Sequence, residues 1–259
     1  MIGSDVTIFE VELEQEKIEK IADVAARGAA IAAELGQELE AVSDFLSHYF
    51  RHVDPLDIDE RSVEDLLGLV ESHYRLAMQR PPARATIAIR TPSQSEDGWS
   101  AGGATIVQIV TDDRPFLVDS VTMEVLRQGW TIREVFHPQF LVRRDVSGTL
   151  REIVRTTEAG PDPEILQESW MHLEILPPAS PERRTEELHS DLEHGLLEVL
   201  RLVEEVVEDW SRMRTRSTET ITLLADPVVT SGRADEPALA IGFRICRANG
   251  RLASKETSV

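Results

Sequence analysis

The sequence predicts an α+β fold, in which an antiparallel sheet with packed helices follows a helical amino-terminal segment and includes one long helix. Two observations predict it. Apolar residues recur at steps of three and four in the first third of the chain and again after residue 180, which is typical of helices. Between these regions, runs of branched residues alternate with polar ones and are separated by glycine- and proline-containing turns, which is typical of strands. With 41% hydrophobic residues in 259, the chain can form a sizeable core.

The first elements are predicted to be helices. The apolar spacing is helical from about Glu14 to His52, and Gly28 and Gly36 are expected to divide this stretch into two helices. A better-marked helix follows, with Ser62 as its cap and Pro81 at its end.

Two histidines at the end of the first helical stretch have the spacing of metal ligands. His48 and His52 would share one helix face. Because no third ligand is evident, two partly solvated histidines beside a hydrophobic seam are the favoured interpretation, and no metal site is predicted.

The middle of the chain is predicted to form the sheet. Its elements are expected at residues 85–92 (strand), 104–113 (central strand), 117–129 (helix), 131–144 and 149–157 (strands joined by a hairpin turn with Gly148), 168–176 (strand) and 181–214 (helix). The order strand, helix, strand, strand hairpin, strand, helix is that of a ferredoxin-like α/β sandwich.

The strand at 168–176 alternates cleanly, so its two faces can be assigned. Met171, Leu173 and Ile175 are expected to face the core, and Trp170, His172 and Glu174 are expected on the less buried face. Replacing Leu173 by alanine should therefore cost far more stability than replacing His172.

The last helix is expected to begin at a Ser180 cap and to run to about Arg214. Its apolar stripe is Leu188, Leu192, Leu196, Val199, Val203, Val206, Trp210 and Met213. At 1.5 Å per residue the helix would be roughly 50 Å long, whereas a sheet of four or five strands is only about 20–25 Å wide. We therefore expect Trp210 to be buried by the amino-terminal helices or by a second copy of the chain.

These patterns divide the chain into three parts. Residues 1–82 are predicted to be an amino-terminal helical segment, residues 83–215 an α/β domain that ends in the long helix, and residues 216–259 a weakly structured tail. Breaks such as Asp226-Pro227 interrupt the tail, so residues beyond about Ser217 are expected to be poorly ordered.

Composition excludes several classes of partner. A formal net charge of -20 repels nucleic acid and anionic membranes, so neither is an expected partner. The single cysteine, Cys246, excludes an internal disulfide and fits a reducing compartment. The sequence has no signal-peptide pattern and no long uncharged apolar run, so we expect a cytoplasmic protein.

The chain lacks the residues of a self-sufficient enzyme. Lys17, Lys20 and Lys255 are the only lysines and lie near its two ends, so no lysine is available for covalent or general-base chemistry in the middle. No dinucleotide, Walker or zinc-protease motif is present. We predict no catalytic residue and no cofactor bound by this chain.

One turn could bind a small molecule. Asp112, Asp113, Arg114 and Pro115 lie between the central strand and the following helix. Carboxylates and a guanidinium at one turn could meet the amine and the carboxylate of an amino-acid effector. These four residues are the candidate effector site.

Several motifs together resemble one family. "RHVDPLDI", "HYRLAMQRPP", "TDDRPFLVDSVTMEVLRQG", "HPQFLVRRDVSGTL", "ESWMHLEI" and "VVEDWSRM" occur in the order found in the large bacterial NAD-specific glutamate dehydrogenases, in the amino-terminal region that carries ACT-like domains. The resemblance covers roughly residues 40 to 215. It implies an ACT-type, ligand-sensing or scaffolding domain, with the NAD fold and the glutamate-binding lysines on a downstream catalytic domain.

The resemblance is incomplete at two places. Many ACT domains have glycine after the proline of the sensing turn, and Phe116 occupies that position here, which favours a structural turn over a ligand site. An aromatic-rich segment expected after the long helix is not reproduced around Phe243.

Three functions therefore remain open. The first is the regulatory or scaffold part of a large glutamate dehydrogenase, which would be inactive alone and would have the downstream domains or a homo-oligomer as partners. The second is a free-standing amino-acid sensor, and the third is an oligomerisation domain without a ligand.

Overall fold

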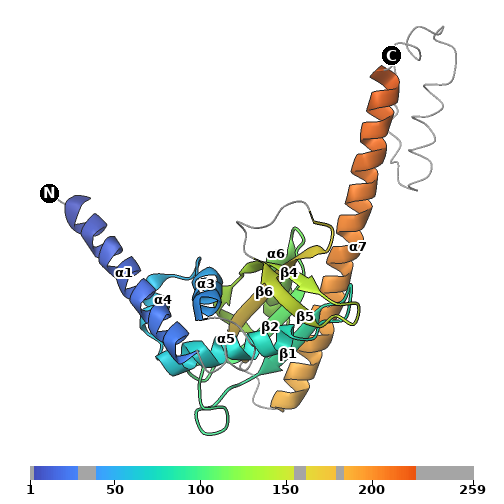
Figure 1. Ribbon diagram of the computed structural model, residues 1–259. Coiled ribbons are helices and arrows are strands. Elements are labelled where there is room, and N and C mark those ends of the chain that lie inside the picture. The colour runs from blue at the N-terminus through green and yellow to red at the C-terminus, as the bar shows by residue number, and fades with distance from the viewer. Residues whose placement is uncertain (1–2, 29–38, 155–161, 179–183, 226–259) are drawn as a thin grey trace, which may run out of the picture. The chain divides into compact units, whose positions relative to one another are not determined.

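The computed structural model describes residues 3–28, 39–154, 162–178 and 184–225 (Figure 1). In chain order the elements are α1 (Gly3–Arg27), α3 (Leu39–Tyr49), α4 (Pro55–Asp59), α5 (Val63–Ala77), β1 (Thr86–Arg90), β2 (Thr105–Asp112), α6 (Leu117–Arg127), β3 (Thr131–Phe136), β4 (Gln139–Arg144), β5 (Leu150–Val154), β6 (Ile165–Leu176) and α7 (Thr185–Ala225). The chain divides into two compact units, residues 1–203 and 204–259, and the first contains the sheet. The predicted α+β class, antiparallel sheet and long helix are confirmed.

The sheet is built around β6. All paired strands are antiparallel, in the order β1-β2-β6-β4-β5, and β3 also pairs with β6. β6 therefore lies between β2 on one side and β3 and β4 on the other, while α6 connects β2 to β3. β1 lies at the edge of the sheet, beside β2. In a ferredoxin-like domain this edge position is occupied by the last strand, which follows the second helix.

Two strand predictions need correction. The strand predicted at 131–144 is two strands, because Pro138, which has no amide hydrogen, interrupts the ladder between β3 and β4. β6 begins at Ile165, inside a segment predicted to be a loop. Residues 165–168 pair with β4 from Phe140 to Arg143, so tertiary pairing extends the strand beyond its sequence pattern.

The predicted helix boundaries at Gly28 and Ser62 are confirmed, but the one near His52 is not. α1 ends at Arg27, next to Gly28, and Ser62 Oγ accepts a hydrogen bond from the Asp65 amide at 3.0 Å as the cap of α5. Gly36 lies outside the described residues. The expectation that His48 and His52 share a helix face is wrong, because α3 ends at Tyr49.

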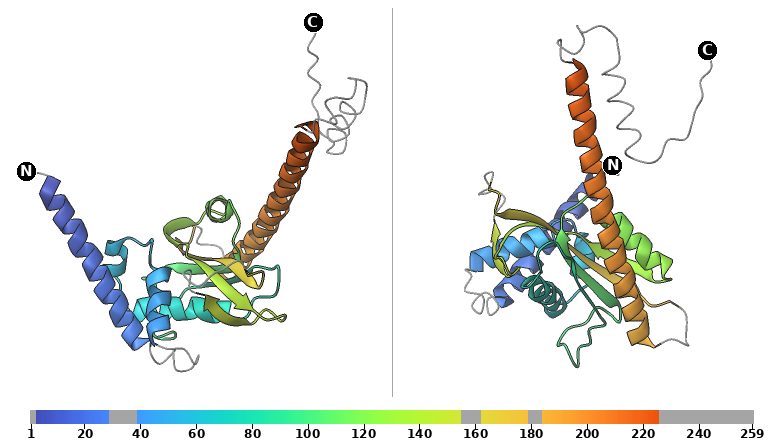
Figure 2. Two further views of the ribbon diagram at one scale, coloured as in Figure 1. Left: turned by 45° about the horizontal axis from the view of Figure 1, so that its top comes forward. Right: turned by 90° about the vertical axis from the view of Figure 1, so that its right-hand side faces the viewer.

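Helices cover both faces of the sheet in the first unit. Figure 2 shows α3 and α5 on one side of the sheet and α6 with the first part of α7 on the other. On the α5 side, aromatic rings form the centre of the core, with the Phe140 and Trp170 centroids 4.8 Å apart and Phe45 and Phe140 5.1 Å apart. The amino-terminal helices thus share a core with the sheet.

This second layer overturns one prediction about β6. Trp170, His172 and Glu174 do lie opposite Met171, Leu173 and Ile175, but both sets are buried, and the first three side chains are 0% exposed. The alternation identified the two faces correctly. It could not show that α3 and α5 would cover the face that carries the polar residues.

α7 is longer than predicted. It extends through 41 residues to Ala225, about 60 Å at 1.5 Å per residue, so the expected end near Arg214 and the expected loss of order after Ser217 are wrong as far as residue 225. Threonine hydroxyls in this part donate to carbonyls four residues earlier, as Thr218 Oγ1 does to Arg214 at 2.9 Å. The predicted Ser180 cap and the tail after residue 225 lie outside the described residues.

Within the described residues, no helix has the length and apolar composition required to cross a membrane.

Candidate functional site

The two aspartates of the predicted effector turn are held by the protein's own donors. Asp112 Oδ1 accepts a hydrogen bond from Arg80 Nη2 at 2.7 Å. Asp113 Oδ1 accepts from Gln139 Nε2 at 2.9 Å, and its Oδ2 accepts from Gln167 Nε2 at 3.1 Å. These contacts tie the end of β2 to the start of β4 and to β6. The geometry is that of a braced strand end.

The other predicted residues of the turn lie beside these aspartates. Arg114 Nη2 is 3.9 Å from Asp112 Oδ2, a loose ion pair at the surface. Pro115 precedes Phe116, whose backbone is left-handed with φ 70° and whose side chain is 66% exposed. Glycine adopts this left-handed conformation without strain, so glycine would suit this position better than phenylalanine.

A buried ion network lies behind the turn. Glu168 on β6 is 0% exposed and accepts hydrogen bonds from Arg80 Nε at 2.8 Å, from Arg144 Nε and Nη2 at 2.6 and 2.8 Å, and from Trp170 Nε1 at 3.1 Å. Arg80 also binds Asp112, so one guanidinium joins the turn to β6. Arginine suits this position because its planar fork can bind two carboxylates at once.

Sequence reasoning missed this network because its members are far apart in the chain. Arg80 follows a helix, Arg144 ends β4, and the alternating pattern predicts a half-exposed strand that begins at Glu168. Their spacing in the sequence does not predict that they cluster. The preference for arginine over lysine in the middle of the chain was the one available signal, and it does not point to particular residues.

A second buried network lies at the other end of β6. Glu174 is 0% exposed and pairs with Arg61 and Arg133, and its carboxylate is 3.6 Å from His172 Nε2. Burial opposes its charged form, but the hydrogen bond from Arg61 and the nearby His172 ring outweigh burial and lower the pKa of Glu174 to about 2. The carboxylate therefore stays charged and locked in its ion pairs.

His73 on α5 connects the helix layer to the sheet. Its Nδ1 is 2.7 Å from the Tyr49 hydroxyl, and its Nε2 is 3.3 Å from the Ile109 carbonyl. Burial, with a further contribution from His172, lowers the pKa of His73 to about 3, so the ring is neutral at pH 7. The neutral ring donates from Nε2 and accepts at Nδ1. Such enclosed groups fix the helices on the sheet and do not meet a substrate.

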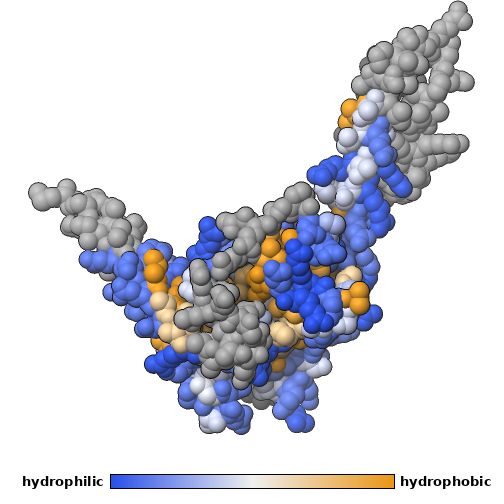
Figure 3. Space-filling view, in the orientation of Figure 1, coloured by the Kyte–Doolittle hydropathy of each residue, from blue (hydrophilic) through white to orange (hydrophobic). Residues whose placement is uncertain are grey.

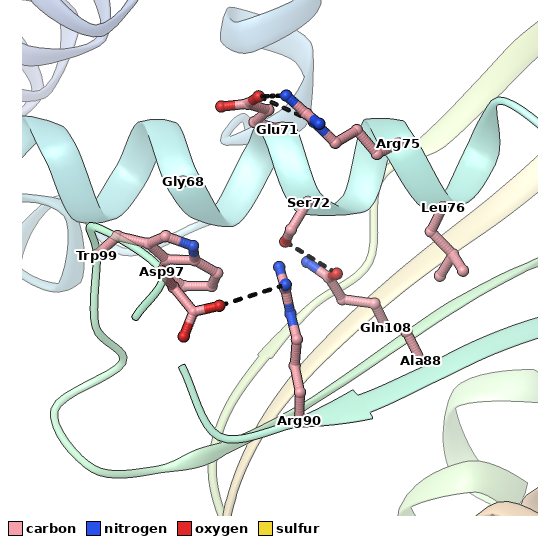
Figure 4. Close-up of a pocket in the computed structure, with 10 residues that line it drawn as sticks. All are labelled: Gly68, Glu71, Ser72, Arg75, Leu76, Ala88, Arg90, Asp97, Trp99 and Gln108. Atoms are coloured by element: carbon pink, nitrogen blue, oxygen red, sulfur yellow. Dashed lines mark hydrogen bonds and ion pairs between the residues drawn. The ribbon is translucent and has the colours of Figure 1, made fainter. Parts of the chain in front are cut away.

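A hollow lies between α5 and the edge of the sheet formed by β1 and β2 (Figure 4). It measures about 560 Å³ and is lined by Gly68, Glu71, Ser72, Arg75, Leu76, Ala88, Arg90, Asp97, Trp99 and Gln108. Ser72 Oγ donates to Gln108 Oε1 at 3.0 Å, and Gln108 is 1% exposed. The hollow therefore has a rigid polar side and, at Trp99 and Leu76, an apolar side. We call it the α5–β1 pocket.

The charges of the α5–β1 pocket are balanced. Arg75 Nε donates to Glu71 at 2.9 Å, whereas Arg90 Nη1 and Asp97 Oδ1 are 3.8 Å apart, too far for a hydrogen bond. Figure 4 shows the Arg90 guanidinium between Asp97 and the Ser72–Gln108 pair. A small zwitterion could place its carboxylate on the guanidinium and its ammonium on Asp97.

Gly68 allows one wall of this pocket to form. A Cβ at this position would come within 2.2 Å of the Trp99 ring, so only glycine lets the indole lie against α5. The same ring lies under the Arg90 guanidinium, 5.3 Å from its Cζ.

The predicted histidine pair is not brought together as a metal site. His48 Nε2 is 2.7 Å from the Gln139 carbonyl, while His52 lies beyond the end of α3. Among the described residues, no group of three or more potential metal ligands is found.

Comparison with known proteins places the chain in a family. Residues 45–192 match the family model described as "Glutamate dehydrogenase, ACT1 domain". The chain belongs to this glutamate dehydrogenase ACT1 family. The resemblance predicted from the sequence motifs over residues 40 to 215 is therefore confirmed.

Similarity to individual proteins supports the assignment to this family. It is 33% identical over 196 residues to the NAD-specific glutamate dehydrogenase of Pseudomonas aeruginosa, which covers 75% of this chain and 12% of the relative. The enzyme of Halomonas elongata is 29% identical over 72% of the chain and 11% of the relative, and that of Mycobacterium tuberculosis is 30% identical over 61% and 9%. The chain thus spans about a tenth of the length of these curated relatives.

Proposed function

We propose that this chain is the amino-terminal regulatory or scaffold part of a large NAD-specific glutamate dehydrogenase. The match to the ACT1 family and to a tenth of each relative supports the proposal. The full enzyme would oxidise L-glutamate with NAD and water to 2-oxoglutarate, ammonium and NADH in the cytoplasm, as part of amino-acid catabolism. NAD and the catalytic residues would belong to a domain outside this chain.

The proposed domain type is a ferredoxin-like ACT domain with one exchanged strand. Its support is the order β2, α6, β3, with β6 inserted between β2 and β3. β1 would replace the final strand of such a domain at the edge beside β2.

One observation favours a scaffold role for the turn at residues 112–115. Its two carboxylates are bound by Arg80, Gln139 and Gln167, and Arg80 is itself buried at 1% exposure. An amino-acid effector would have to displace these contacts, which costs more than binding to unbonded groups. We therefore propose that the turn fixes β2, β4 and β6 as a rigid unit on which the rest of the enzyme is built.

A domain exchange tests the scaffold proposal. Residues 40–215 would replace the matching region of the Pseudomonas aeruginosa enzyme, and glutamate-dependent NADH formation would be followed at 340 nm. The chimera should be active, and Glu168→Gln within it should reduce the yield of assembled enzyme. Glu152→Gln is the matched control, because it makes the same substitution at an exposed side chain of the sheet, and it should leave the yield unchanged.

Two results would contradict the scaffold proposal. An assembled chimera that carries Glu168→Gln and keeps full yield would show that the buried network is dispensable. NADH formation by the purified 259-residue chain alone, above a buffer control, would show that it is not an inactive part.

The α5–β1 pocket supports a second candidate function, amino-acid sensing. Its loosely paired Arg90 and Asp97, 3.8 Å apart, match the two charges of an amino acid better than the braced turn does. Calorimetry against the twenty amino acids would detect binding. Loss of binding in Arg90→Gln but not in Asp113→Ala assigns the ligand to the pocket, and the reverse assigns it to the turn. If none of the twenty binds, the sensing function is excluded for this set of ligands.

A further inference from the structure

The apolar stripe of α7 continues past the part of the helix that is buried. Seven positions follow one another at alternating steps of four and three: Leu192, Leu196, Val199, Val203, Val206, Trp210 and Met213. This is the heptad spacing that places a continuous seam against a neighbouring helix. Leu192 and Leu196 are 0% exposed and Val203 is 8% exposed, whereas Val206, Trp210 and Met213 are 61%, 61% and 44% exposed.

The exposed part of the seam is narrow. On the side shown in Figure 3, the surface of α7 after residue 203 is mostly hydrophilic, so apolar residues do not surround the helix. Val206, Trp210 and Met213 instead follow one line along it at heptad spacing. A helix with one apolar line and a polar remainder is suited to a single helical partner.

The charges beside this seam are separated along the helix. Four acidic residues precede or adjoin Trp210, namely Glu204, Glu205, Glu208 and Asp209, and three basic residues follow it, namely Arg212, Arg214 and Arg216. Two copies of this segment in antiparallel orientation would bring the acidic part of each against the basic part of the other. A parallel pair would bring like charges together. The sequence is therefore complementary to itself in one orientation only.

Ion pairs within one copy do not remove this complementarity. Arg212 contacts Glu208 at 2.8 Å and Asp209 at 3.3 Å, and all three side chains are exposed. Exposed pairs of this kind contribute little to stability. The same side chains can therefore also pair with a second helix at a small cost in free energy.

We propose that residues 206–217 of α7 pair with the same residues of a second copy of this chain as a short antiparallel coiled coil. Trp210 of each copy lies opposite Met213 of the other, and Val206 lies opposite Ser217 of the other. The contact is symmetric about a two-fold axis between Trp210 and Met213, so it closes as a dimer. This inference does not depend on the glutamate dehydrogenase proposal.

Sedimentation equilibrium of the 259-residue chain at tens of micromolar tests the pairing. The chain should have twice the mass of one copy, and Trp210→Glu should halve it. Thr215→Glu is the matched control, because it adds the same charge on the opposite side of the helix and should leave the dimer intact. Circular dichroism and thermal melts check that both variants keep the fold, which their positions outside the buried core predict.

Cross-linking tests the orientation. In a Cys246→Ser background, chains carrying Val206→Cys and chains carrying Ser217→Cys should form a disulfide when mixed and should not do so separately. A parallel pair would give the opposite result, because each position would then lie next to itself.

Three outcomes would overturn the inference. They are a monomer at all concentrations, a dimer that survives Trp210→Glu, and a Val206→Cys chain that cross-links to itself. Persistence of the dimer when the glutamate dehydrogenase chimera fails would leave the inference intact and reject only the enzyme assignment.

Discussion

The two faces of the sheet bury the same central strand in different ways. Toward α6 and α7, β6 presents Met171, Leu173 and Ile175, which are apolar and buried. Toward α3 and α5 it presents Glu168, Trp170, His172 and Glu174, all 0% exposed. One face is thus an ordinary hydrophobic contact, and the other is a layer of ions and hydrogen bonds inside the protein. We call them the apolar face and the polar face.

The difference shows what holds the amino-terminal helices in place. Apolar burial is non-directional, so the apolar face tolerates adjustment of the helices packed on it. The polar face does not, because a buried charge without its partner is strongly destabilising. Arg61, Arg80 and His73 come from the helical region or its connections, and each bonds to β6 or β2. The polar face therefore specifies one arrangement of helices and sheet.

The largest expected effect comes from breaking the polar face. Glu168→Gln removes the charge that holds Arg80 and Arg144, which are 1% and 3% exposed at their side chains. Leaving buried guanidiniums without a carboxylate should cost about 3–5 kcal/mol of unfolding free energy. Urea denaturation measures it, with Glu152→Gln on the exposed side as the control. A loss below about 1 kcal/mol would mean that water reaches the network.

A direct comparison of neighbours on β6 should give the next largest effects. Leu173→Ala removes core volume from the apolar face and should cost about 2–5 kcal/mol. His172→Ala should cost about 1–3 kcal/mol, because it removes the group that lies 3.3 Å from Gln108 and 3.6 Å from Glu174. The same denaturation experiment applies to both. A negligible loss for His172→Ala would restore the expectation that this face is exposed.

Acid should weaken the polar face selectively. The pKa of His73 is about 3 in the folded protein, below its ordinary value of 6.5, so between these values only the unfolded chain binds the proton. Stability is then complete above pH 6.5 and falls with decreasing pH, by at most about 2 kcal/mol between pH 6.5 and 5. The lowered pKa of Glu174, about 2, adds a further loss below about pH 4.5.

A variant isolates the contribution of His73. His73→Gln can keep both hydrogen bonds but does not titrate, so its urea midpoint should change less between pH 7 and 5 than that of the parent. His172, whose pKa is also lowered by burial, acts in the same direction and should account for part of the remaining dependence. If the urea midpoint of His73→Gln changes between pH 7 and 5 as much as that of the parent, groups other than His73 cause the acid sensitivity.

The smallest effect is expected at the turn that leads into α6. Phe116 adopts φ 70° with its ring largely exposed, so Phe116→Gly should leave stability unchanged or raise it by up to about 1 kcal/mol. Gly148→Ala is the contrasting change, since its Cβ would fall 1.9 Å from the Arg80 carbonyl and must destabilise the protein. Thermal melting of both variants measures the difference, and a large loss in Phe116→Gly would show that the ring has a contact of its own.

Local chemistry made several elements predictable. The Ser62 cap, the break at Gly28, the hairpin with Gly148 at φ 87° and the buried β2 follow from short-range rules, and each is present. The family was also readable from the order of the motifs. Such features depend on neighbours within a few residues, which the sequence displays directly.

The candidate site was only partly readable. The turn at Asp112 and Asp113 was identified from its position after a strand, but its donors Arg80, Gln139 and Gln167 come from three distant segments. The α5–β1 pocket was not foreseen, because Arg90 and Ser72 become neighbours only when α5 packs on β1 and β2.

Spacing along the chain was enough to predict the class of the fold, the order of its elements, the two alternating faces of β6 and the heptad seam of α7. Only the folded structure buries both faces of β6 and pairs Glu168 and Glu174 with arginines inside the protein. The reason is that burial of a charge depends on partners brought from elsewhere. Arg61, Arg80 and Arg144 lie up to 113 residues from the carboxylates they bind, and only the folded chain places them there.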